Sequence, residues 1–375
     1  MGRRARDIAI QALALALIVG AIVYLADNAI ANMARRAIAS GFAFLANPAG
    51  FGVPMTLIPF DESSTYGRAF LVALLNTLLV SAVGVVFATI LGFTIGIARL
   101  SRNWLIARLA GAYVEAIRNV PLLLQIFVWY FAVLRALPPP RQSLSLFGAV
   151  YLNNRGIYVP APIVDARFEW IAIAFGVVLA VAIAIARWGR RRREMTGRPF
   201  PLAWAAIGLP VIVLLVGAPL VQWETPVLRG FNFGGGAGLI PEFAALAIAL
   251  SIYTASFIAE NVRSGILSVP RAQVEAAYAL GLTRGQTLRL VVIPQALRVI
   301  VPPLTGQYLN LIKNSSLGAA IAYPELVALF GGTVLNQTGQ AIEVIAITMG
   351  VYLLISLAIS AAMNRYNRSI ARVER

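Results

Sequence analysis

The 375-residue chain contains no cysteine and no histidine, and Lys313 is its single lysine. The first two absences exclude disulfides, thiolate or imidazole metal ligands, and nucleophiles that depend on a histidine base. A P-loop needs a lysine between a glycine-rich turn and Ser or Thr, whereas Lys313 stands between Ile312 and Asn314. We therefore expect this chain to have no catalytic residue, to bind no metal and to carry no nucleotide-binding loop.

Charged residues are also scarce. They make up 12% of the chain, whereas 59% of the residues are hydrophobic. A soluble domain has about 25% charged residues, so polar side chains are too few here to cover a water-soluble particle. The formal net charge of +16 comes from arginines in short segments between apolar runs, without the interleaved aromatics of a nucleic-acid groove. The composition predicts an all-α integral membrane protein that contacts lipid and does not bind nucleic acid.

Eight apolar runs approach the length of about 20 residues that crosses a bilayer. They cover residues 8–24, 70–97, 121–137, 170–187, 202–223, 241–261, 301–322 and 341–363. The helix of the third run is expected to begin either there or before Arg118. With both termini in the cytoplasm, most arginines collect on the cytoplasmic side, as the positive-inside rule requires. We expect the first run to remain as an anchor rather than to be cleaved as a signal.

The chain divides into four predicted segments. Residues 1–66 contain the first span and an outer segment, and residues 67–137 contain the first part of a core. Residues 138–240 are interpreted as an insertion with two spans whose middles carry no ionisable residue, which favours a lipid-facing or scaffolding role. Residues 241–375 contain the second part of the core, including a cytoplasmic loop at 268–294.

Gly92 and Gly96 in the second run have the spacing that lets a neighbouring helix approach closely. Such pairs also arise by chance in glycine-rich membrane helices. The sequence leaves open whether this stripe serves a contact with another subunit.

The loop at residues 268–294 is the most informative part of the chain. Good helix formers run from 271 to 280, and Gly281 suits the left-handed residue that ends a helix. The small side chains of Ala276 and Ala277 would let this helix enter a groove of another protein, although a plain surface helix is the alternative. The residues assigned to this contact are Glu275, Ala276, Ala277, Gly281, Arg284 and Pro294.

This loop resembles the EAA signature of the permease subunits of ABC importers. Glu275-Ala276-Ala277 is followed by Gly281 after three intervening residues, and Val291-Val292-Ile293-Pro294 follows after nine more intervening residues. The resemblance implies a type I importer permease fold with a five-helix core, here with three additional helices. It also implies that the loop helix is a coupling helix that docks on a separate ATPase subunit, which would bind ATP and Mg²⁺.

Residues 113–123, 259–266 and 311–317 resemble the polar amino-acid branch of these importers, in particular the Q subunits of general L-amino-acid importers. That resemblance implies translocation of polar, acidic or a broad range of L-amino acids across the bacterial inner membrane. It further implies a second permease subunit, expected to be a paralogue, and a periplasmic amino-acid-binding protein as partners. Asn314 departs from the acidic residue expected at its position in many relatives, which leaves the charge preference open.

Ionisable groups inside spans are costly and are usually functional. Lys313 lies about 18 Å into a helix that starts at Val301, near mid-depth, and Glu260 lies near the cytoplasmic end of its run. This pair would neutralise an amino-acid zwitterion or, alternatively, each other. We expect selectivity to depend on Glu260 and Asn314. The candidate substrate contacts are Asn314, Glu260, Lys313, Ser256, Asn310, Asn76 and Thr77, of which the last two also suit contacts between helices.

Two other functions stay open at this point. An ion-coupled secondary amino-acid transporter usually shows an inverted repeat and broken helices, and no convincing repeat is found. The other alternative is a structural membrane subunit that translocates nothing. A co-purifying ATPase and a second permease chain would favour the importer, whereas transport by this chain alone would favour the secondary transporter.

Overall fold

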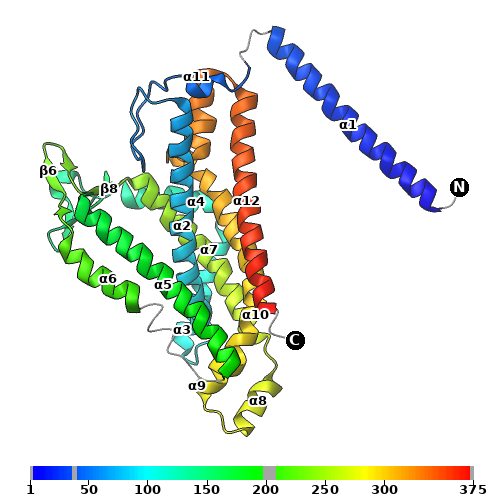
Figure 1. The fold of residues 1–375 in the computed structure, drawn as a ribbon, viewed down its shortest axis with the longest axis vertical. Helices are drawn as coiled ribbons and strands as arrows, with labels where there is room; N and C mark the ends of the chain where they lie inside the picture. The colour runs from blue at the N-terminus through cyan, green and yellow to red at the C-terminus, as the bar shows by residue number, and fades with distance from the viewer. Residues whose placement is uncertain (1–2, 36–39, 197–207, 372–375) are drawn as a thin grey trace. The chain divides into compact units, whose positions relative to one another are not determined.

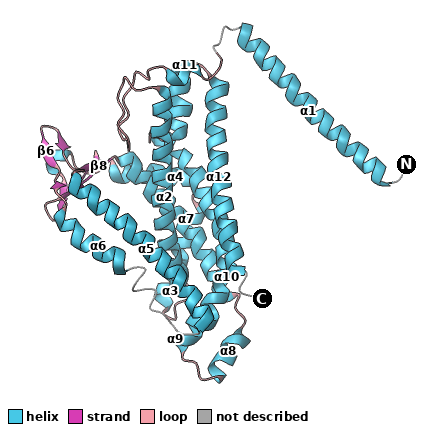
Figure 2. Cartoon of the chain, in the orientation of Figure 1, coloured by secondary structure: helices cyan, strands magenta, loops and turns pink. Residues whose placement is uncertain are grey.

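The computed structural model describes residues 3–35, 40–196 and 208–371, and the structural statements below concern those residues. The chain forms two compact units. One consists of residues 1–127 together with 245–375, and the other of residues 128–244. Helices dominate the described residues, and the few strands belong to the second unit (Figures 1 and 2).

Five helices are long and apolar enough to cross a membrane. They are α2 (Tyr66–Ala98), the part of α5 (Ala166–Thr196) up to Gly189, α7 (Pro241–Leu267), a continuous helical stretch at 284–321, and α12 (Ala341–Ala371). Shorter apolar helices occur within α1 (Arg3–Arg35) and in α6 (Leu209–Gly217) with η5 (Ala218–Leu220). Each of the eight predicted runs therefore overlaps a helix, while positions 202–207 of the fifth run lie outside the described residues.

A bend divides the region of the third predicted run. Helix α3 (Trp104–Asn119) and the helical stretch made of α4 (Leu122–Phe127) and η2 (Val128–Leu134) meet at 105°. Pro121 lies at the bend, where its ring removes a backbone donor and restricts the residue before it. The side-chain amide of Gln125 donates to the carbonyls of Ile117 and Val120, each at 2.9 Å, and so satisfies two carbonyls at the bend.

Helices α2 and α7 approach each other closely at Gly92 and Gly96. A Cβ atom on Gly92 would lie 2.5 Å from Ile258 Cγ2, and one on Gly96 would lie 2.8 Å from the carbonyl oxygen of Ala259. The small-residue stripe therefore packs on a helix of the same chain.

The predicted outer segment contributes to a hydrophobic core at one end of α2. Phe44 of η1 (Ala43–Ala46) is buried together with Val72 of α2, Phe330 of η8 (Leu326–Val334) and Val344 of α12. The cluster fixes η8, the π-helical stretch between the last two spans, against α2 and α12. A short helix, α11 (Leu335–Thr338), then leads to α12.

The second unit adds short strands to the all-α architecture predicted from the sequence. A four-stranded antiparallel sheet has the order β1-β2-β3-β8, and two further strand pairs are β4-β5 and β6-β7. The strands are β1 (Leu144–Leu146), β2 (Val150–Asn153), β3 (Gly156–Val159), β4 (Ala161–Pro162), β5 (Trp223–Glu224), β6 (Val227–Arg229), β7 (Asn232–Gly234) and β8 (Ala237–Leu239). The 3-10 turn η3 (Pro140–Gln142) precedes β1. Within this unit α5 packs against α6.

Candidate coupling loop and membrane pocket

Helix α8 (Arg271–Ala279) lies where the sequence predicts a helix in the 268–294 loop. Gly281 ends it with a backbone φ of +79°, in the left-handed region that only glycine adopts without strain. The N–H of Gly281 donates to the carbonyl of Tyr278 at 2.9 Å, and the N–H of Leu282 donates to that of Ala277 at 3.1 Å. These bonds satisfy carbonyls at the helix end and fix the direction in which the chain leaves α8.

One face of α8 is open. Glu275 and Ala276 are exposed, whereas Ala277 is buried. Tyr278 is 48% exposed and Leu280 is 83% exposed. An exposed apolar patch beside an acidic side chain is typical of a surface that another protein covers.

The loop is tied to a long helical segment. Thr283 and Gln286 form a capping box that starts α9 (Arg284–Thr287), and η6 (Leu288–Val292) continues into α10 (Ile293–Asn314). Gln295 in the first turn of α10 donates from its side-chain amide to the Gln273 side chain of α8. This hydrogen bond joins α8 to the beginning of α10. Arg284 and Pro294 are exposed at this junction.

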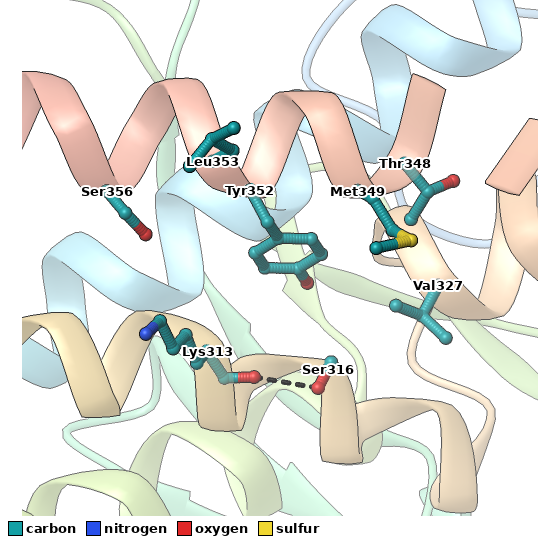
Figure 3. A pocket seen from close by; sticks show the side chains of 8 residues that line it. All are labelled: Lys313, Ser316, Val327, Thr348, Met349, Tyr352, Leu353 and Ser356. Atoms are coloured by element: carbon teal, nitrogen blue, oxygen red, sulfur yellow. Dashed lines mark hydrogen bonds between the residues drawn. The ribbon is translucent and has the colours of Figure 1, made fainter. Parts of the chain in front are cut away.

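A cavity of about 440 Å³ lies at the other end of α10. Lys313 of α10 and Ser316 of η7 (Ser315–Ile321) form one wall, and α12 forms the opposite one (Figure 3). The polar residues of α12 recur every four positions and so share a helical face. They are Thr348, Tyr352 and Ser356. The volume falls in the range of small-ligand pockets, roughly 300–1,000 Å³.

A second cavity of about 510 Å³ lies next to the first. It is lined by Phe51 and Pro54 of the outer segment and by small residues between 319 and 333. Val327 of η8 lines both cavities, so η8 borders each of them.

Among the predicted substrate contacts, Lys313 is the one that lines the 440 Å³ cavity. Asn310 is exposed and Asn314 is partly buried on the same helix. The helix that carries Lys313 begins at Ile293 rather than at the Val301 assumed from the sequence, and Lys313 is the penultimate residue of α10. The backbone tightens into the 3-10 turn of η7 directly after Asn314.

Glu260 is paired with arginines and not with Lys313, the partner considered from the sequence. Its carboxylate forms ion pairs with Arg99, the residue directly after α2, and with Arg263, the latter at 3.3 Å. Ser256 is buried and donates its hydroxyl to the carbonyl of Tyr253 at 2.6 Å. A direct substrate contact of either residue stays a prediction.

Asn76 and Thr77 are fully buried where α2 meets the segment before η8. The Asn76 amide donates to the carbonyls of Met55 (3.0 Å) and Pro324 (2.9 Å). The Thr77 hydroxyl oxygen accepts the N–H of Leu326 at 3.0 Å. Both side chains thus hold η8 in place, which is the contact role that the sequence left open for them.

Replacing Asn76 by alanine is expected to lower stability, because two buried carbonyls lose their partner at a cost of about 1–3 kcal/mol each. The thermal unfolding midpoint of the purified protein should fall, while the ratio of uptake rates among amino acids should stay as in the wild type. Thr94→Ala, an exposed hydroxyl on the same helix, is the control. A changed selectivity at unchanged stability would show that Asn76 contacts substrate instead.

Glu325 was missed by the sequence analysis because it lies between two apolar runs. It is fully buried and accepts the N–H groups of Val327 (2.8 Å) and Ala328 (2.7 Å) and the hydroxyl of Tyr352 (3.1 Å). Loss of water on burial raises the pKa of Glu325 to about 7, against the opposing effect of these donors. Glu325 therefore caps η8 and, through the hydroxyl of Tyr352, connects η8 to α12. Its position as a single acidic residue in an otherwise uncharged stretch of the sequence could have indicated a structural or functional role.

The family of the chain follows from its sequence relationships. The family of binding-protein-dependent transport system inner membrane components matches residues 84–372. The chain belongs to this family, which confirms the resemblance to ABC importer permeases.

Relatives match along nearly the whole chain. The putative amino-acid ABC transporter permease protein YhdX of Escherichia coli is 55% identical, covering 97% of this chain and 94% of its own. The general L-amino acid transport system permease protein AapQ of Rhizobium johnstonii is 52% identical over 99% of this chain and 93% of its own. BztB of Rhodobacter capsulatus, a glutamate/glutamine/aspartate/asparagine transport system permease protein, is 42% identical over 99% of this chain and 95% of its own.

Proposed function

We propose that this chain is the permease subunit of an ATP-driven importer that moves L-amino acids across the bacterial inner membrane. The observation that carries the proposal is the arrangement along one helical segment. The exposed α8 lies at the beginning of the 284–321 segment, and the Lys313 cavity lies near its end. A force applied to α8 by a partner therefore has a continuous helical route to the cavity. The names of the three relatives support amino acids as the substrate.

ATP and Mg²⁺ are assigned to a separate ATPase subunit. The single lysine of the chain is not in a P-loop, so this polypeptide supplies no phosphate-binding lysine of that type. The open face of α8, with Leu280 and Ala276, is the docking surface, and Glu275 and Arg284 supply charges beside it. Both termini are placed in the cytoplasm together with this loop by the positive-inside rule.

The remaining partners are a second permease subunit, expected to be a paralogue, and a periplasmic amino-acid-binding protein. Such a receptor would deliver substrate to the outer side, where the 510 Å³ cavity and η8 lie under this orientation. We expect η8 to move during transport, because it borders both cavities.

Purification of the full chain from its native membrane tests the proposal. We expect an ATPase and a second permease chain to co-purify, and proteoliposomes of the complex to accumulate amino acid when ATP and the receptor are present. Uptake by this chain alone, driven by an ion gradient, would instead establish the secondary transporter. Stable co-purification without uptake under any of these conditions would favour the structural subunit.

A further inference from the structure

The cavity in Figure 3 carries one formal charge. Of the residues that line it, Lys313 is a cation and none is a carboxylate. The other polar groups are the hydroxyls of Ser316, Thr348, Tyr352 and Ser356. The cavity therefore has a positive electrostatic character.

The acidic side chains of the neighbouring elements are held by other partners. Glu260 is bound by two arginines, and Glu325 caps η8. Glu343, at the start of α12, accepts the N–H of Gly41 at 2.6 Å. Among the described residues, both ion pairs of the chain belong to Glu260, and Lys313 has no carboxylate within 4.0 Å.

Most hydroxyl protons in the cavity are already donated. Ser316 donates to the carbonyl of Lys313 at 2.7 Å, Thr348 to that of Val344 at 2.8 Å, and Tyr352 to Glu325. The hydroxyl of Ser356 has no partner among the described residues and faces the Lys313 ammonium across the space between α10 and α12 (Figure 3). The donors left for a ligand are thus the ammonium of Lys313 and the hydroxyl of Ser356.

An ammonium in a membrane-spanning segment is costly without a counter-charge. Lys313 is exposed, so its attraction for an anion comes from its charge: hydrogen bonds between an ammonium and a carboxylate are about twice as strong as neutral ones. We infer that Lys313, assisted by Ser356, binds the carboxylate of the transported amino acid in this cavity. The inference rests on the proposed function. It adds that the substrate is recognised by its carboxylate, and that Lys313 is the residue that recognises it.

The charge of the cavity also implies a preference. A cationic side chain entering it would meet Lys313 without a compensating acid, whereas an acidic or neutral amino acid would not. The site therefore favours acidic and neutral amino acids over arginine and lysine. The bound carboxylate is either the α-carboxylate, shared by all amino acids, or the side-chain carboxylate of the acidic ones.

Equilibrium binding measures this site directly and does not depend on ATP. The full chain, purified with its co-purifying subunits and reconstituted in nanodiscs without the receptor, would be dialysed against radiolabelled glutamate, glutamine and arginine. We expect Lys313→Gln to weaken glutamate binding by about 10- to 100-fold, the loss of a charge-assisted hydrogen bond, and Lys313→Arg to retain most of it. Met349→Leu, an uncharged change in the same cavity, should bind as the wild type does.

The pattern over ligands identifies the bound group. A loss for glutamate alone in Lys313→Gln assigns the side-chain carboxylate, and an equal loss for glutamate and glutamine assigns the α-carboxylate. Unchanged binding in Lys313→Gln, arginine bound by the wild type as tightly as glutamate, or no binding by the wild type would overturn the inference. An equal fall in the unfolding midpoint of Lys313→Gln and Lys313→Arg, with binding lost in both, would also overturn it. ATP-driven uptake by the wild-type complex would still support the proposed function in each of these cases.

Discussion

Replacing Gly281 by valine is expected to reduce ATP-driven uptake and substrate-stimulated ATP hydrolysis at least tenfold, while the protein remains in the membrane. A residue with a Cβ pays about 1–2 kcal/mol in the left-handed conformation, and a β-branched one pays more. The φ of +79° would therefore relax, and the turn that ends α8 would be lost. Because nothing lies within 4 Å of an added Cβ, the substitution changes the turn without disturbing the packed core.

Gly285, four positions later, is the matched control. An added Cβ also meets open space there, but its φ is not positive, so Gly285→Ala should lower uptake less than twofold. Uptake and ATP hydrolysis would be measured on proteoliposomes with equal amounts of complex. Wild-type uptake and substrate-stimulated ATP hydrolysis in Gly281→Val would show that the geometry of this turn is not needed to couple ATP hydrolysis to transport.

Replacing Gly96 by valine is expected to damage the fold itself. The first added carbon would lie 2.7 Å from Val262 Cβ and 2.8 Å from the carbonyl oxygen of Ala259, and the backbone oxygen cannot rotate away. Helices α2 and α7 would have to separate, at a cost of about 1–3 kcal/mol or more, and the ion pair of Arg99 with Glu260 joins the same two helices. We expect a large loss of protein from the membrane and a lower unfolding midpoint.

Gly111 on α3 provides the comparison, because an added Cβ there has no neighbour within 4 Å. Gly111→Ala should be neutral or slightly stabilising, since alanine is the better helix former. Wild-type abundance and an unchanged midpoint in Gly96→Val would contradict the close packing of α2 on α7.

The membrane helices were predictable from sequence because the bilayer imposes their length and apolarity. The strands of residues 144–239 were not, since segments of two to four residues are too short to show an alternating pattern. The bend at Pro121 was only partly visible, because the ionisable Arg118 obscured where one helix ends and the next begins.

Helix α8 was also predictable, since its helix formers and its terminating glycine are local in sequence. The cavity was not, because it depends on contacts between distant segments. Asn76 binds the carbonyl of Pro324, 248 positions away, and no local pattern indicates that contact. The helix face of Thr348, Tyr352 and Ser356 was overlooked because it has no charge, although its four-residue spacing was present in the sequence.

We propose that α8 of this chain docks on a separate ATPase. A photo-crosslinking amino acid placed at Ala276, on the exposed face of α8, tests it most directly in native membranes, with Leu146 of β1, 58% exposed, as the control position. We expect the Ala276 probe to attach to a polypeptide that carries a P-loop, and the Leu146 probe not to do so. Labelling of lipid alone at Ala276, or equal labelling of the ATPase from both positions, would contradict it.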